Sequence, residues 1–82
     1  MVYYAYILRS KVDGRLYKGH ASDLEVRLKE HNSGKTRSTK GYIPWELVYY
    51  EEFETKAKAI AREKFFKSGF GREYIKSILD KK

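Results

Sequence analysis

The chain of 82 residues contains no cysteine, a single proline and no long run of apolar residues. Without cysteine, disulfide bonds and thiolate metal sites are excluded, so any bound metal must be held by oxygen or imidazole ligands. The lack of cysteine fits a reducing interior, and we expect the protein to be cytoplasmic. No stretch approaches the apolar length of a membrane span and no signal-peptide pattern opens the chain, so we expect no membrane partner.

Acidic residues are also in short supply. Eleven Asp and Glu stand against 18 Lys and Arg, which gives a formal net charge of +7. Such an excess favours a polyanionic partner, of which nucleic acid is the commonest, although a lysine-rich surface without any partner would give the same charge. The length is that of one small domain, and we expect residues 1–82 to form a single domain with one sheet and two or three helices.

The first third of the chain predicts two short strands that lead into a helix. The strands are expected at residues 3–8 and 16–19, with a tight hairpin turn at Asp13-Gly14, because glycine accepts a positive φ without steric cost. Both faces of the first strand are largely apolar, so we expect it to lie inside the sheet. Ser22 and Glu25 form a capping-box pattern, which places the start of the helix there.

The predicted helix carries two basic residues in an otherwise apolar stripe. Its positions i, i+3, i+4 and i+7 lie on one face and are Leu24, Arg27, Leu28 and His31. An arginine aimed at a core needs an anionic partner, because an unpaired buried charge is very costly. An internal ion pair or a snorkelling stem would explain Arg27. An anion pocket between this helix and the tyrosine-rich strands would explain it equally well, and the residues alone leave both interpretations open.

Residues 45–53 are rich in aromatic and branched side chains and predict a third strand. Four of its large side chains are expected to share one core face: Trp45, Leu47, Tyr49 and Phe53. The whole chain therefore predicts an α/β fold, a three-stranded antiparallel sheet flanked by helices, in the order strand, strand, helix, strand, helix, helix.

Thr55 is the expected N-cap of a second helix that runs to about Lys67. Its packing stripe is expected to consist of Ala57, Ile60, Ala61 and Phe65. Glu63 lies on a neighbouring stripe, where an ion pair with Lys67 at i+4 is the ordinary role for it. A last helix follows, with Tyr74, Ile75, Ile78 and Leu79 expected to pack.

The loop at residues 32–41 contains three positive charges and no acid. It is a solvated linker or a loop that contacts phosphates, in which Lys35, Arg37 and Lys40 supply charge and hydroxyls such as that of Thr39 supply donors. The neighbouring anion pocket favours the second interpretation.

Two short motifs resemble those of the GIY-YIG nuclease family, and specifically of its small, single-domain bacterial members. The first motif stands as Tyr4-Ala5-Tyr6, with a tyrosine in place of glycine, and the second as Tyr17-Lys18-Gly19, with a lysine at its apolar centre. Arg27 and His31 follow at the positions of the family's helix, and Glu63 falls where the family places its metal-binding glutamate. The ordered set covers nearly the whole chain.

The resemblance implies an endonuclease that hydrolyses phosphodiester bonds in nucleic acid, DNA in preference to RNA, with one divalent metal, Mg²⁺ or Mn²⁺, held by Glu63. Tyr6 would act as general base or position the water, a task for which nearby positive charge must lower its pKa. Tyr17 would orient the water or the phosphate. Arg27 would neutralise the phosphate and His31 would assist by a hydrogen bond.

The expected contacts with the nucleic-acid backbone are Lys18, Lys35, Arg37 and Lys40. A lone domain of this kind also suggests a protein partner that supplies specificity. Two rival functions remain open on the residues alone. One is a non-catalytic nucleic-acid-binding module with a degenerate site, and the other is a partner-binding protein that uses the aromatic sheet.

Overall fold

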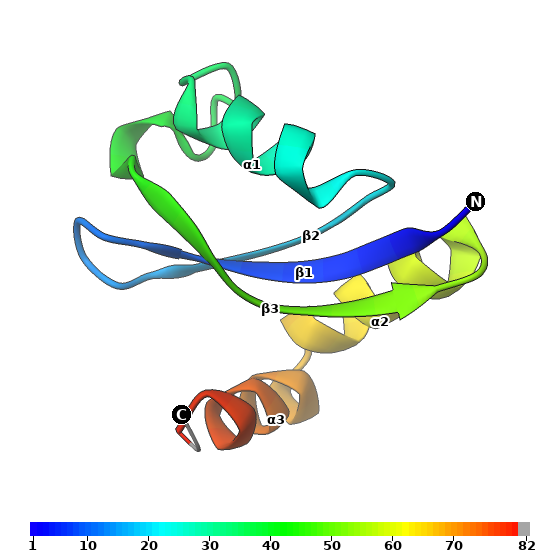
Figure 1. The fold of residues 1–82 in the computed structure, drawn as a ribbon. Coiled ribbons are helices and arrows are strands. Elements are labelled where there is room, and N and C mark those ends of the chain that lie inside the picture. The colour runs from blue at the N-terminus through cyan, green and yellow to red at the C-terminus, as the bar shows by residue number, and fades with distance from the viewer. Residues whose placement is uncertain (81–82) are drawn as a thin grey trace.

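The computed structural model, which describes residues 1–80, contains a three-stranded antiparallel sheet with helices on both faces (Figure 1). The elements in chain order are β1 (Tyr3–Ser10), β2 (Leu16–Ala21), α1 (Leu24–Asn32), the short 3₁₀ helix η1 (Lys40–Tyr42), β3 (Trp45–Phe53), α2 (Lys56–Lys67) and α3 (Gly69–Asp80). The strand order β2-β1-β3 places β1 in the middle, with α1 on one face and α2 and α3 on the other. The predicted α/β fold and its element order are confirmed.

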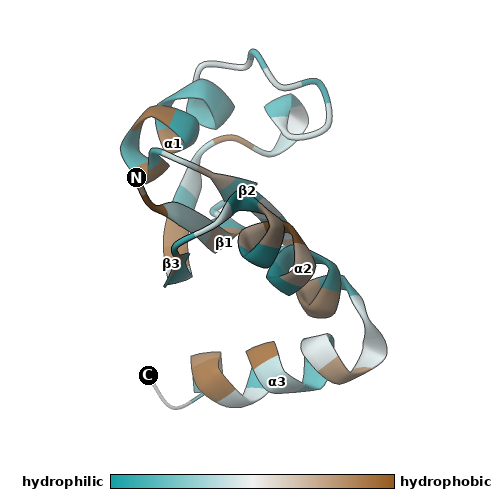
Figure 2. Cartoon of the chain, turned by 90° about the vertical axis from the view of Figure 1, so that its right-hand side faces the viewer, coloured by the Kyte–Doolittle hydropathy of each residue, from teal (hydrophilic) through white to brown (hydrophobic). Residues whose placement is uncertain are grey.

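The central strand β1 is buried on both faces, as its sequence predicts. Tyr6 and Leu8 belong to an apolar cluster beneath α1, whereas Ala5 and Ile7 belong to a second cluster with Phe66 of α2. Because side chains alternate along a strand, this one segment supplies both cores. Figure 2, which colours the chain by hydropathy, shows α1 and the α2–α3 pair on opposite sides of the three strands. Among residues 1–80, no helix is long and apolar enough to cross a membrane.

The expectation that Trp45, Leu47, Tyr49 and Phe53 share one face of β3 is wrong. Leu47 pairs with Leu8 and packs in the α1 cluster, whereas Tyr49 pairs with Ile7 and packs in the opposite cluster. The register shifts between these two pairs, so one extra residue, Val48, is accommodated on β3. Such a bulge reverses the facing of every residue that follows it.

Helices α1 and α2 each begin at a residue whose side chain caps the first turn. The N-cap of α1 is Asp23, whose Oδ1 accepts a hydrogen bond from the Val26 backbone N–H at 3.0 Å, and not Ser22 as the capping-box pattern predicts. Thr55 caps α2 as expected, accepting from the Lys58 N–H at 3.2 Å. Gly14 has a φ of 79° in the connection between β1 and β2, which confirms why a glycine stands there.

The packing stripe of α2 is rotated from the predicted one. The buried residues are Ala59 and Phe66, whereas Ala57 and Ala61 are exposed. Glu63 lies on the same inward-facing stripe as Ala59 and Phe66, so this rotation aims its carboxylate at the sheet. Helix α3 packs as expected, with Ile75 buried.

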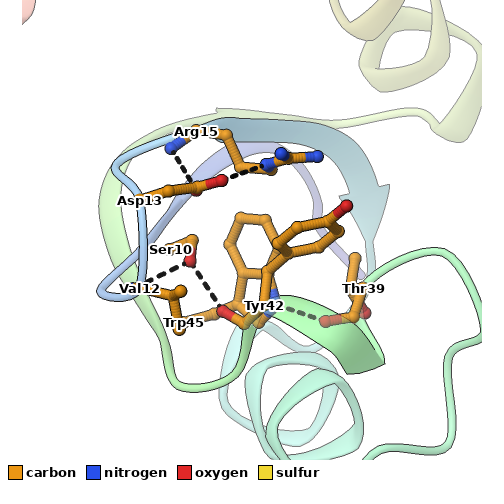
Figure 3. Close-up of polar contacts among 7 residues, drawn as sticks. All are labelled: Ser10, Val12, Asp13, Arg15, Thr39, Tyr42 and Trp45. Carbon is orange, nitrogen blue, oxygen red and sulfur yellow. Dashed lines mark hydrogen bonds and ion pairs between the residues drawn. The ribbon is translucent and has the colours of Figure 1, made fainter.

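The segment between α1 and β3 is tied to the hairpin that joins β1 and β2. Ser10 Oγ donates to the Tyr42 carbonyl at 2.7 Å, and the Arg15 guanidinium lies 3.6 Å from the centre of the Tyr42 ring (Figure 3). Trp45 Nε1 donates to the Thr39 carbonyl at 2.9 Å. These contacts hold the C-terminal end of the basic loop in place.

Candidate active site

Three predicted site residues meet between the sheet and α1. The Tyr6 hydroxyl lies 3.0 Å from His31 Nε2, and His31 Nδ1 lies 2.9 Å from Thr39 Oγ1. The Tyr17 ring centre lies 4.8 Å from that of His31 and 6.3 Å from that of Tyr6. Tyr6 and His31 are each only 1% exposed, so they form the floor of the site beneath its surface.

The hydrogen bonds define where the protons lie. Thr39 Oγ1 donates to the Thr36 carbonyl at 3.3 Å, so it must accept from His31 Nδ1–H. His31 Nε2 is then the acceptor for the Tyr6 O–H. Burial, and then repulsion by Arg27, lowers the pKa of His31, which keeps the ring neutral.

The expectation that positive charge activates the Tyr6 phenol is not met by this arrangement. Burial, followed by the neighbouring Tyr17, raises the pKa of Tyr6 well above its ordinary value, and the opposing influence of Arg27 is smaller. The Tyr6 hydroxyl is therefore a neutral donor to His31. Tyr17 is the partly exposed member of the pair, and its hydroxyl forms no hydrogen bond within residues 1–80.

Gly19, the last residue of the second motif, has a steric reason to be glycine. It pairs with Tyr6 across the β1–β2 ladder, and the Tyr6 ring lies directly over its Cα. A Cβ at this position would lie 2.5 Å from Tyr6 Oη and 2.7 Å from Tyr6 Cζ. The ring reaches His31 only because no side chain is present on β2 at this point.

Arg27 lies at the rim and not in the core. Its side chain is 46% exposed and its Nε lies 3.3 Å from Glu30 Oε1, so the arginine has an anionic partner on the surface of α1 and not the internal ion pair that the helical stripe suggests. Arg27 also lines a small cleft of about 140 Å³ at the end of β2. The cleft is lined by Tyr3, His20, Ala21, Ser22, Arg27 and Lys56. Of these residues none is acidic, which makes the cleft suited to an anion.

Glu63 belongs to α2 and contacts His20, which lines the cleft. Its Oε1 is 2.5 Å from His20 Nδ1 and its Oε2 is 2.6 Å from Lys67 Nζ. The ion pair with Lys67 predicted from the i+4 spacing is confirmed. Burial by itself would raise the pKa of Glu63, but the hydrogen bonds from Lys67 and His20 outweigh it and hold the pKa below its ordinary value. Glu63 is therefore a carboxylate, only 16% exposed.

The side chains around Glu63 suit a metal held by one carboxylate and by waters, but not a metal enclosed by several protein ligands. Within residues 1–80, no three His, Asp or Glu side chains come together, so the described residues offer no all-protein metal cage. A single carboxylate suits Mg²⁺, which keeps several waters and takes further oxygens from a phosphate. Lys67 is 54% exposed on a flexible stem, so it can leave Glu63 Oε2 to such an ion.

The predicted nucleic-acid contacts separate into two groups. Lys35, Arg37 and Lys40 are all exposed on the loop after α1. Thr39 of the same loop is fully buried, so its expected role as a phosphate donor is wrong. Lys18 alternates with Tyr17 on β2 and therefore faces α2 and α3, on the opposite face from the loop.

His20 is the functional candidate that sequence reasoning missed. It follows the second motif directly and shares the α2 face of β2 with Lys18, so strand alternation could have placed it near Glu63. A lone histidine in a strand carries no signal of its own. Lys56 begins α2, and a lone lysine at the start of a helix carries no signal of its own either.

Comparison with known proteins gives the class that the fold and the site define. Residues 2–76 match the GIY-YIG catalytic domain, and the chain therefore belongs to the GIY-YIG family. Members known as GIY-YIG nucleases act on nucleic acid.

Within this family the chain is similar to the UPF0213 proteins. It is 42% identical over 77 residues to one from Staphylococcus saprophyticus, which covers 93% of each chain. It is 40% identical over 67 residues to one from Haloquadratum walsbyi, covering 80% of this chain and 74% of the relative. The solution NMR structure of the UPF0213 protein from Bacillus halodurans superposes with a TM-score of 0.56 at 37% identity, covering 95% of this chain and 85% of that one.

Proposed function

We propose that the protein is an endonuclease that hydrolyses phosphodiester bonds in nucleic acid, with DNA as its preferred substrate. The observation that carries the proposal is the cleft at the end of β2. There, Arg27 and Lys56 provide positive charge, and His20 connects the cleft to the carboxylate of Glu63. Simple binding of a polyanion needs cations, but it does not need a carboxylate held among them.

The roles of the residues follow from where they lie. Arg27 neutralises the scissile phosphate from the rim, and its exposed guanidinium can exchange Glu30 for two phosphate oxygens. Tyr17 orients the attacking water or the phosphate with its free hydroxyl. Tyr6 and His31 assist from beneath, because their hydrogen bond holds the tyrosine ring against Gly19.

Glu63 would hold one Mg²⁺ or Mn²⁺ ion by a single carboxylate. A metal bound there supplies Lewis acidity and a water of lowered pKa. When Glu63 leaves Lys67 for the metal, the Lys67 ammonium is free to pair with a phosphate oxygen. The Glu63–Lys67 ion pair of the free protein and the substrate complex therefore exclude each other. A protein partner that supplies target specificity completes the proposal.

The test is cleavage of single-stranded, duplex and branched DNA, and of the matching RNAs, with Mg²⁺, with Mn²⁺ and with a chelator. The wild-type protein is expected to cut DNA only when a metal is present. Arg27→Ala should reduce both binding and cleavage, because Arg27 serves the bound phosphate and the transition state alike. Lys29→Ala is the matched control, since Lys29 is an exposed cation of the same helix that pairs with Glu25.

The outcomes separate the proposal from its rival. A protein that binds all these substrates and cuts none of them would be a non-catalytic binding module. A protein that binds none of them would exclude both functions.

A further inference from the structure

A second concave surface lies on the opposite face of the sheet from the loop after α1. It is a groove of about 310 Å³ between the β1–β2 hairpin and α3. Its apolar floor is made by Leu16, Ile75 and Leu79, which also belong to or pack against the core cluster around Phe66. Its cations are Arg9, Lys18, Arg72 and Lys76, and the only acid among the residues that line it is Asp80.

The cations of the groove are poorly neutralised. Arg9 pairs with Glu46 at 3.3 Å, but Lys18, Arg72 and Lys76 form no ion pair with any residue of the described chain. Burial, and then repulsion by Arg72 and Lys67, lowers the pKa of Lys18. Like charges held together around an apolar floor repel one another unless an anion lies between them.

The groove and the cleft at the end of β2 are neighbours along this strand, since Lys18 lines the groove and His20 lines the cleft. Lys18 and His20 lie on the same face of β2 and, as alternate residues of a strand, are separated by roughly 7 Å. Lys67 lies near both regions. It pairs with Glu63 at 2.6 Å, and its positive charge helps to lower the pKa of Lys18. Within residues 1–80, β2 is an edge strand of the sheet, with β1 as its partner.

We propose that the groove between β2 and α3 binds the phosphates of the nucleic-acid strand that flanks the scissile bond. The proposal rests on the proposed function, because it assigns the groove to the same substrate. A nucleic-acid strand matches both features of the groove: its phosphates meet Lys18, Arg72 and Lys76, and its sugars and base edges cover the apolar floor. The path from the cleft to the groove then fixes the direction in which the strand leaves the site.

The experiment compares two triple variants of equal charge. Lys18→Gln/Arg72→Gln/Lys76→Gln removes the three groove cations that form no ion pair, and Lys11→Gln/Lys58→Gln/Lys64→Gln removes three exposed cations that do not line it. Binding of fluorescent single-stranded DNA is followed by anisotropy over a range of salt concentrations. The slope of log affinity against log salt should become shallower by about 2 in the groove variant, since each lost phosphate contact contributes about 0.7 on single strands.

Substrate length gives a second readout. The wild-type protein should bind a strand of about 8 nucleotides more tightly than a dinucleotide, because only the longer strand reaches both cleft and groove. The groove variant should lose this preference, whereas the control variant should keep it. Arg72→Gln/Lys76→Gln repeats the test with two exposed residues of α3, in case loss of the partly buried Lys18 impairs folding.

The results distinguish the groove from the catalytic proposal. If the slope and the length preference change while no variant and no wild-type protein cuts DNA, the groove is upheld as a binding site and the nuclease proposal fails. If DNA is cut but the groove and control variants bind alike, the groove proposal is overturned. Equal competition by poly-glutamate for the wild-type protein would also overturn it, because the groove would then recognise charge without nucleic acid.

Discussion

The two faces of the sheet hold the candidate site residues under opposite conditions. On the α1 face, Tyr6 and His31 are buried, neutral and bonded to each other, with Thr39 completing the chain of hydrogen bonds. On the α2 face, His20 and Glu63 are only partly buried, and an ion pair with Lys67 is part of the arrangement. The buried Tyr6–His31–Thr39 network therefore determines shape, whereas the His20–Glu63–Lys67 group supplies charge.

Because of this difference, substitutions on the two faces are expected to have different effects. A change in a buried, fully bonded network alters folding stability, because it leaves a polar group without its partner. A change at a partly exposed carboxylate alters chemistry far more than stability, because water can replace the lost partner. The predictions below use this contrast.

Glu63→Gln is expected to have the largest effect on the charged face. It keeps the size of the side chain but removes the charge proposed to hold the metal, so cleavage should fall by about 100-fold or more. Binding of DNA should persist or improve slightly, because a negative charge near the phosphate is gone. Single-turnover cleavage and anisotropy measure the two effects. Glu54→Gln, at an exposed acid, is the control, and equal loss of activity in both variants would refute the assignment.

Gly19→Ala tests the close packing on the neutral face. The added methyl group would contact the Tyr6 ring at its hydroxyl end, and the free energy of unfolding should fall by about 1–3 kcal/mol. Gly41→Ala is the matched control, because nothing lies within 4 Å of a Cβ there. Urea unfolding measures both variants, and an unchanged Gly19→Ala protein would show that the ring moves freely.

Tyr6→Phe removes one hydroxyl from the buried network and leaves His31 Nε2 without a donor. We expect a loss of about 1–3 kcal/mol in the free energy of unfolding, together with reduced cleavage and retained binding. Tyr17→Phe should change stability by less than about 0.5 kcal/mol, since its hydroxyl has no bond to lose within residues 1–80. Equal destabilisation by the two substitutions would contradict the contrast between these tyrosines.

Replacing Lys35, Arg37 and Lys40 together with alanine tests the loop on the α1 side. All three side chains are exposed, so stability should hold while DNA binding weakens. Each lost phosphate contact should reduce the slope of log affinity against log salt by roughly 1 unit on duplex DNA. An unchanged slope in the salt titration would identify the loop as a linker.

The smallest expected effect is a pH dependence of stability that originates at His31. Its pKa is lowered by burial, so the unfolded chain takes up a proton at a higher pH than the folded protein does. The contribution of His31 is therefore complete above about pH 6.5, its ordinary pKa, and declines as the pH falls below that value. Urea unfolding at about pH 7.5 and about pH 5.5 measures the decline. In His31→Gln the decline over this interval should be smaller, and an identical profile would exclude His31 as its source.

The sequence predicts those parts of the fold that depend on composition within one element. The apolar faces of β1 predict a buried central strand, and the spacing of Glu63 and Lys67 predicts their ion pair. The bulge at Val48 is not predictable from alternation, because an inserted residue changes the facing of a strand without changing its composition. The stripe of α2 is ambiguous for a related reason, since alanines such as Ala57 and Ala61 suit a surface as well as a core.

The motifs select the candidate site residues, whose roles stay predictions, and they indicate only part of the geometry. The motifs identify Tyr6, Arg27 and Glu63, but they do not indicate that the Tyr6 hydroxyl is buried against His31. That contact depends on how α1 crosses the sheet, which is a tertiary property. His20 is missed because its importance comes from Glu63, which is 43 residues away in the chain.

Trp45 gives one of the two faces an optical signal of its own. It is the chain's only tryptophan, is buried at the start of β3, and lies beside Tyr17 and Tyr42. Its indole N–H is bonded to the loop carbonyl of Thr39, so emission wavelength and intensity respond to the order of the α1 side. No tryptophan is present in α2 or α3, so loosening of that layer alone leaves the emission nearly constant while far-UV ellipticity falls. Fluorescence and circular dichroism recorded on the same unlabelled sample can thus determine which layer separates from the sheet first.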